Sequence, residues 1–320
     1  MTTKIDATTA RSLLAHHLGD ADWNCRSFGA GRFSQTFAAE NPADGSEYVL
    51  RVAPPDSMLQ LFYEYRMMRQ EPALHARLRQ ETTVPVPSIL AYDFSHRRID
   101  RDYLIMSRLP GIPLSQADLP GQARHRALRE WGRAISQVHG LTDSDNRFGY
   151  LGEHRCMEPQ PTWCQAFLEM FDRELQDIVK CGVYDRKTAA WALGLLARYS
   201  HVLDSCRTSH LLHGDIWITN LLVQPDGAVS GVLDFDRACW GDVEWDLAIA
   251  DYCGVTGSAF WEGYGREVRR DSGDAAVRRL FYLVYEHQKY IVISMSERRN
   301  DPQGARRYAR ESIEMLQQSE

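Results

Sequence analysis

The sequence lacks the segments and cysteine patterns of membrane and secreted proteins. No apolar run in its 320 residues approaches the roughly 20 needed to cross a bilayer. The N-terminal segment has no uninterrupted apolar stretch of the kind that marks a secretory signal. The seven cysteines are scattered, odd in number and never spaced as Cys-x-x-Cys, which argues against a disulfide framework or a zinc site. We therefore expect a cytoplasmic protein without a membrane partner.

The sequence also has fewer positive than negative charges. Its 37 Lys and Arg residues against 43 Asp and Glu residues give a net charge of −6. This balance disfavours a nucleic-acid partner and suits a cationic small molecule, although many cytosolic enzymes are mildly acidic. There is no internal repeat and no low-complexity tract. The composition, 44% hydrophobic and 25% charged, is that of a globular protein with one large or two modest domains, and we expect a monomer or a homodimer.

The strongest pattern lies between residues 210 and 236. His213–Asp215 is followed by Asn220 and then by Asp234–Asp236. Phosphoryl transfer needs such a set, because one carboxylate orients a hydroxyl group and other oxygen ligands hold Mg²⁺ on the phosphates. The spacing from Asp215 to Asn220 equals that of the H-R-D-x-x-x-x-N loop of protein kinases.

Local geometry supports a shared metal site. Two β-type runs, 220–223 and 229–233, flank the turn signal Pro225-Asp226-Gly227. Asn220 and Asp234 are equally far from the turn glycine, so a hairpin returns them to within a residue or two of each other. Facing residues in such a pair lie roughly 4.5–5.5 Å apart at Cα, close enough to share one ion. The alternative is that both residues simply end strands.

These motifs resemble the catalytic core of the aminoglycoside phosphotransferase and choline kinase family. Gly241-Asp242 and Asp246-Leu247-Ala248 match the G-D-x-x-x-D-L-A continuation of that family. The resemblance implies that Asp215 is the catalytic base and that Asn220 and Asp234 are Mg²⁺ ligands. It also implies that His213 and Asp246 support the catalytic loop structurally. Asp236 stands where a protein kinase has glycine, which argues against a protein kinase.

The resemblance implies a bilobal α+β, protein-kinase-like fold. We expect an N-lobe over residues 1–106 with an antiparallel sheet and one helix, a hinge over 107–111, and a mostly helical C-lobe over 112–320. Apolar spacing favours helices in the following segments: Ala7–Leu18, Ser57–Gln80, Gln122–His139, Pro161–Lys180, Thr188–Asp204 and Ala275–Gln317.

The N-lobe contains candidate nucleotide-binding residues. Gly29 and Gly31 lie between two β-type runs, where backbone N–H groups can approach phosphate, although the same pattern also occurs in ordinary hairpin bends. Ser34 could add a hydroxyl contact. Arg51 stands where the family has a cation that binds phosphate; otherwise it would cap a strand edge in solvent. Glu71, or alternatively Glu64, would pair with Arg51, and we prefer Glu71.

The hinge and the acceptor site are less sharply defined. The buried run that ends at Pro110-Gly111 predicts a linker that contacts the nucleotide base through Met106 and the main chain of Ser107 and Leu109. Acidic side chains would hold a cationic acceptor, and the candidates are Asp251, Glu262 and Glu286.

The sequence therefore predicts an O-phosphotransferase that uses ATP, or GTP, with Mg²⁺. An aminoglycoside-type antibiotic is the preferred acceptor, and a choline-like, sugar or hydroxy amino acid metabolite is the alternative. The alternative from a different functional class is a nucleotide-binding module without catalytic activity. A metal-dependent hydrolase built on His213 and Asp215 would need further His ligands at hydrolase spacing, and the sequence lacks them.

Overall fold

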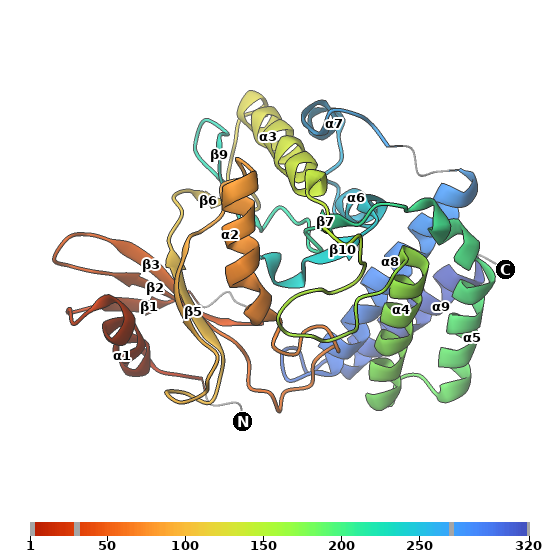
Figure 1. Ribbon diagram of the computed structural model, residues 1–320, viewed down its shortest axis with the longest axis horizontal. Coiled ribbons are helices and arrows are strands. Elements are labelled where there is room, and N and C mark those ends of the chain that lie inside the picture. Colours follow the sequence, from red (N-terminus) through yellow and green to blue (C-terminus); the bar gives the residue numbers. More distant parts are fainter. Residues whose placement is uncertain (1–3, 29–32, 269–271, 319–320) are drawn as a thin grey trace.

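The protein is described by a computed structural model that covers residues 4–28, 33–268 and 272–318 (Figure 1). Its N-terminal part is a five-stranded antiparallel sheet in the order β1-β2-β3-β5-β4. The strands are β1 (Asn24–Ser27), β2 (Gln35–Glu40), β3 (Glu47–Val52), β4 (Ile89–Asp93) and β5 (Tyr103–Ser107). Helix α1 (Ala7–Leu18) covers one face, as its apolar spacing predicts.

Strand β3 presents Arg51 on the face opposite α1. Leu50 and Val52 are fully buried and pack in the cluster that contains the apolar residues of α1. Because side chains alternate along a strand, Arg51 between them points to the other face of the sheet. This alternation directs the guanidinium toward the C-terminal part of the chain.

The segment expected to be one helix over Ser57–Gln80 is helical only at its end. The structure has a 3₁₀ turn, η1 (Met67–Gln70), followed by helix α2 (Glu71–Glu81). Pro72 lies in the first turn of α2. N–H groups in the first turn of a helix have no partner within the helix, so the missing N–H of proline costs no hydrogen bond there. Proline therefore starts this helix, and the residues before it run as turns and coil.

The C-terminal part is mostly helical. Its helices are α3 (Gly121–Gly140), α4 (Trp163–Lys180), α5 (Arg186–Arg198), α6 (Val243–Tyr252), α7 (Ser258–Tyr264), α8 (Gly273–Met295) and α9 (Pro302–Gln317), with the 3₁₀ turns η2 (Ser200–Ser205) and η3 (Phe235–Arg237). Two small sheets complete it: β6 (Ile112–Pro113) with β8 (Leu221–Val223) and β9 (Val229–Val232), and β7 (His210–Leu212) with β10 (Cys239–Gly241).

Two predicted helices are shorter than expected. The helix over Thr188–Asp204 ends at Arg198 and continues as η2, and the helix over Ala275–Gln317 is two helices separated by residues 296–301. Asp301 caps the second helix by accepting a hydrogen bond from the Gly304 N–H at 2.8 Å, with Pro302 next to it. In the described part of the chain, no helix has both the length and the apolar character required to cross a membrane.

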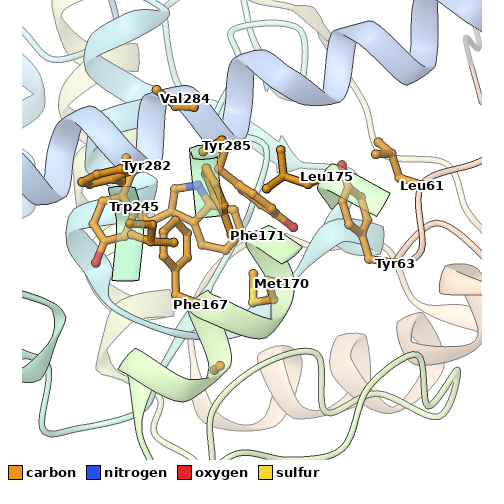
Figure 2. Close-up of a cluster of buried hydrophobic side chains, with 14 of the residues drawn as sticks. Leu61, Tyr63, Phe167, Met170, Phe171, Leu175, Trp245, Tyr282, Val284 and Tyr285 are labelled. Carbon is orange, nitrogen blue, oxygen red and sulfur yellow. The ribbon is translucent and has the colours of Figure 1, made fainter. Parts of the chain in front are cut away.

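Residues 53–66 leave the sheet and pack against the helical part. Leu61 and Tyr63 belong to the largest buried cluster, beside the aromatic side chains of α4 and α8 (Figure 2). The Phe62 N–H donates to Asp177 of α4 at 2.7 Å. Next to them, Arg298 donates two hydrogen bonds to the Glu64 carboxylate at 2.8 and 2.6 Å. This segment therefore joins the two lobes a second time.

We predict that Arg298→Met lowers the free energy of unfolding by about 3–5 kcal/mol, because it leaves the buried Glu64 carboxylate without its bidentate partner. Chemical denaturation measures the change. Arg310→Met is the control, since its ion pair with Glu314 on α9 is exposed and contributes about 0–1 kcal/mol. Equal losses in the two variants would contradict the prediction.

Candidate active site

A buried carboxylate fixes the backbone of the loop that follows β7. Asp246 of α6 accepts hydrogen bonds from the N–H groups of His213 (2.6 Å) and Gly214 (2.9 Å), and His139 Nε2 lies 3.1 Å from it. Burial acts to raise the pKa of Asp246, but the contact with His139 and these backbone bonds prevail and lower it. The ionised side chain thus holds the loop from within the core.

Gly214 is required by this loop for two reasons. Its φ of +77° lies in the left-handed region, which glycine adopts without strain. In addition, a Cβ atom at this position would lie 2.4 Å from the carbonyl oxygen of Arg237. The catalytic-loop segment and the segment after Asp234 therefore touch backbone to backbone.

The Asp215 side chain is held and still accessible. Asn220 Nδ2 donates to the Asp215 carboxylate at 2.9 Å and to its carbonyl oxygen at 3.0 Å. His213 is fully buried; its Nδ1 lies 3.2 Å from the Asp215 nitrogen and its Nε2 lies 3.0 Å from the Leu233 carbonyl oxygen. With both ring nitrogens engaged, His213 is placed to organise the loop. The Asp215 side chain is 22% exposed and can receive a substrate group.

The hairpin places Asn220 next to Asp234. Strands β8 and β9 pair with a register shift at Leu222/Val223, and the Leu233 N–H donates to the Asn220 carbonyl oxygen at 2.9 Å. The residue opposite Asn220 is therefore Leu233, one position from Asp234. Asp234 has a φ of +69°, and its side chain is 39% exposed.

A single guanidinium from β3 gathers three carboxylates. Arg51 lies 2.7 Å from Glu71 of α2, 3.2 Å from Asp234 and 3.1 Å from Asp236. Burial raises the pKa of Glu71 to about 7, while Arg51 acts to lower it. Burial and the neighbouring Asp234 also raise the pKa of Asp236 well above its usual range. Glu64, the alternative partner of Arg51, is paired with Arg298 instead.

The donor set at this point fits Mg²⁺. Asn220 uses its amide nitrogen on Asp215, which leaves the amide oxygen for a cation, and Asp234 supplies a partly exposed carboxylate. Among the described residues no group of three or more His, Cys, Asp and Glu could hold a metal ion. A cation here would thus depend on two protein oxygens together with phosphate oxygens, which is the usual way that Mg²⁺ binds in kinases.

Arg237 is a site residue that the sequence patterns do not single out. Its Nη1 lies 3.5 Å from Asp215 Oδ1, and its Nη2 lies 3.2 Å from Glu286 Oε1. The guanidinium also stacks over the ring of Tyr63, 5.2 Å from the centroid. The signal for it is weak but present: an arginine stands directly between Asp234–Asp236 and the apolar run Ala238–Trp240, where a surface charge is unexpected.

The other residues predicted to contact the nucleotide differ in burial and in hydrogen bonding. Gly29 and Gly31 lie outside the described residues. Ser34 is buried, and its hydroxyl has no hydrogen-bond partner among the described residues. Met106 is buried at the end of β5 among apolar side chains. The Ser107 N–H already donates to the Ser88 carbonyl oxygen at 2.9 Å, so this group is not available to a nucleotide base.

Leu109 lies two residues after the end of β5, near β9. A Cβ atom at Gly231 would lie 2.9 Å from the Leu109 side chain. The linker is therefore packed directly against the hairpin that carries Asn220 and Asp234.

The structure does not gather the three expected acceptor carboxylates. Glu262 on α7 lies 3.2 Å from Arg129 of α3, and Asp251 lies 3.6 Å from Arg279. Glu286 is close to the catalytic loop, but it is buried and paired with two cations. Because Arg237 and Lys289 engage one oxygen each, the structure gives no support to the expectation that Glu286 binds a cationic acceptor.

Comparisons with known proteins found a matching family and several similar proteins. The model of the "phosphotransferase enzyme family" matches residues 24–282. A probable ketoamine kinase of Vibrio cholerae is 30% identical over 228 residues, which cover 67% of this chain and 71% of that protein. Viomycin phosphotransferase of Streptomyces vinaceus is 30% identical over 150 residues, 46% of this chain and 48% of that protein.

Among solved structures, a thermostable mutant of aminoglycoside phosphotransferase APH(4)-Ia has a similar fold. Its ternary complex with AMP-PNP and hygromycin B superposes with a TM-score of 0.66 at 19% identity, covering 97% of this chain and 98% of that one. This likeness confirms the predicted kinase-like fold of a small sheet lobe and a larger helical lobe. The family match over most of the chain shows that the protein belongs to the phosphotransferase enzyme family.

Proposed function

We propose that this protein transfers the γ-phosphoryl group of ATP to a hydroxyl group of a small molecule. The observation that carries the proposal is that Asp215 is accessible and oriented by Asn220, while Asp234, one position beyond the residue that pairs with Asn220, lies 3.2 Å from Arg51. A base, a cation site and a phosphate-binding guanidinium thus share one location between the lobes. The AMP-PNP bound by the structurally similar APH(4)-Ia supports ATP as the donor.

The residues divide the chemistry as follows. Asp215 accepts the proton of the acceptor hydroxyl as its oxygen bonds to the γ-phosphorus, and the bond to the bridging oxygen breaks to release ADP. Arg51 binds the phosphates and stabilises charge that develops during transfer. Mg²⁺, when held by Asn220 and Asp234, neutralises phosphate charge. Glu71 and Asp236 orient Arg51 toward this space.

For the acceptor we propose a sugar-derived amine of the ketoamine class. The relative from Vibrio cholerae carries that name and shares 30% identity over most of its length. Trp217, two residues after Asp215, is 38% exposed and offers a flat aromatic face suited to a sugar ring. An aminoglycoside-type or other antibiotic is the second candidate, and the relative named viomycin phosphotransferase supports an antibiotic. A polycationic acceptor would need free acidic side chains, whereas Asp251, Glu262 and Glu286 are all paired with cations.

We predict that Asp215→Asn reduces phosphoryl transfer by about 100- to 10,000-fold and leaves nucleotide affinity almost unchanged, because the amide cannot accept the proton. The experiment follows ADP formation with a lysine-derived ketoamine, a free sugar, an aminoglycoside and viomycin as acceptors. Turnover only with the antibiotics would reject the ketoamine proposal. Turnover retained in Asp215→Asn would reject Asp215 as the base.

We predict that Glu71→Gln weakens nucleotide binding by about tenfold, measured by titration calorimetry with AMP-PNP and Mg²⁺. Without the Glu71 carboxylate, Arg51 loses its shortest ion pair and is drawn toward Asp234 and away from the phosphates. Glu81→Gln is the matched control, since Glu81 lies in the last turn of the same helix and pairs with Arg77 at the surface. Unchanged affinity in Glu71→Gln would show that Arg51 does not depend on this pair.

A further inference from the structure

A row of alternating charges runs from the catalytic loop into helix α8. Asp215 lies 3.5 Å from Arg237, Arg237 lies 3.2 Å from Glu286, and Glu286 lies 2.5 Å from Lys289. Arg237, Glu286 and Lys289 are buried, with side-chain exposures of 10% or less. Buried charges of this kind are restrained by their partners, because each unpaired group would carry a large desolvation cost.

Glu286 is held from three directions. Its Oε1 accepts hydrogen bonds from Arg237 Nη2 and Trp245 Nε1, both at 3.2 Å, and its Oε2 accepts from Lys289 Nζ. Trp245 is fully buried on α6, so it gives the carboxylate a rigid contact. Both oxygens are therefore fixed inside the core, and Glu286 acts on other protein groups.

A neighbouring acid does not compete with Glu286 for these cations. Glu174 of α4 is completely buried, and in the described ranges neither of its oxygens has a hydrogen-bond partner. Burial, followed by the charge of Glu286, raises the pKa of Glu174 well above its usual range, which favours the uncharged form of this acid. Burial and Arg237 disfavour the charged form of Lys289, yet attraction to Glu286 prevails and its pKa is raised.

The distance between Arg237 and Asp215 matters for proton transfer. An arginine in direct contact with a carboxylate forms charge-assisted hydrogen bonds at roughly 2.7–2.9 Å. Arg237 Nη1 remains 3.5 Å from Asp215 Oδ1, while its Nη2 is drawn to Glu286. Asp215 is thus oriented by a nearby cation, and Oδ1 keeps room to accept a proton.

We propose that Glu286 is a positioning residue of the active site, which holds Arg237 in place and thereby keeps the Asp215 carboxylate oriented and free to accept the proton of the acceptor. The inference rests on the proposed function, in which Asp215 is the base. It assigns Glu286 to the phosphoryl-transfer step and excludes it from acceptor recognition.

The test is the Glu286→Gln variant, assayed for kcat and for the acceptor KM. The amide retains the shape of Glu286 but loses the charge, so Arg237 should close onto Asp215. We expect kcat to fall by about 10- to 100-fold, with the acceptor KM and nucleotide affinity changed by less than about threefold. A raised acceptor KM at unchanged kcat would instead identify an acceptor contact and overturn the proposal.

A matched control breaks a different charge pair that also involves helix α8, with its acid, Glu244, on α6. Glu244→Gln removes the partner of Arg278, a buried arginine of α8 that Glu244 binds in a bidentate pair at 3.0 and 2.8 Å. We expect Glu244→Gln to lower stability and to leave kcat intact. An equal fall in kcat in both variants would mean that loss of any charge pair on α8 impairs the enzyme, and the proposal would be wrong.

Two further variants test the route through Arg237. If Glu286 acts through Arg237, the double variant Arg237→Met/Glu286→Gln should have the same kcat as Arg237→Met alone, whereas independent effects would multiply. Glu286→Asp keeps the charge and should recover part of the kcat lost in Glu286→Gln. Independent effects, or no recovery, would contradict the proposal.

A measurement without any acceptor separates this inference from the proposed function. Hydrogen exchange of the amides of residues 213–220 should be faster in Glu286→Gln than in the wild type, and should increase more in this variant than in Glu244→Gln. If the wild type phosphorylates none of the acceptors, the proposed function fails, and the exchange data still decide whether Glu286 positions the loop. Unchanged exchange in Glu286→Gln would overturn that role.

Discussion

The structure depends on the requirement that a buried charge must have a partner. Three arginines meet this requirement across long sequence distances: Arg51 with Glu71, Asp234 and Asp236; Arg237 with Asp215 and Glu286; and Arg298 with Glu64. A guanidinium cannot lose its proton at any ordinary pH, so each one constrains the elements that supply its carboxylates. The sheet, helix α2, the catalytic loop and helix α8 are positioned relative to one another by these pairs.

The sequence predicts well which residues at the centre of the candidate site lie close together, because that part is local. His213, Asp215 and Asn220 lie within eight residues of each other, and the Pro225-Asp226-Gly227 turn brings Asp234 back to Asn220 within one position of register. A turn motif and strand alternation are sufficient for this inference, because both depend on neighbouring residues only. Such patterns do not predict the register shift within the hairpin.

The contacts that the sequence does not predict join residues far apart in the chain. Glu64 and Arg298 are separated by 234 positions, and the patterns around each of them describe an ordinary surface charge. The same is true of Arg237 and Glu286. The sequence patterns do not single out Arg237, and they suggest an acceptor-binding role for Glu286, so they do not predict the contact between the two residues. The segment over residues 53–66 has helical apolar spacing, but Leu61 and Tyr63 gain more from burial against α4 and α8 than from a helix of their own.

The overall charge of the chain and the charge around Asp215, the proposed base, lead to different expectations for the acceptor. A net charge of −6 favours a cationic acceptor, yet the acidic side chains nearest the base are balanced by Arg51, Arg237 and Lys289. Recognition depends on the field at the site, and paired buried charges produce little net field outside the pair. This balance of charge is why we propose an acceptor with hydroxyl groups and modest charge, in preference to a polycation.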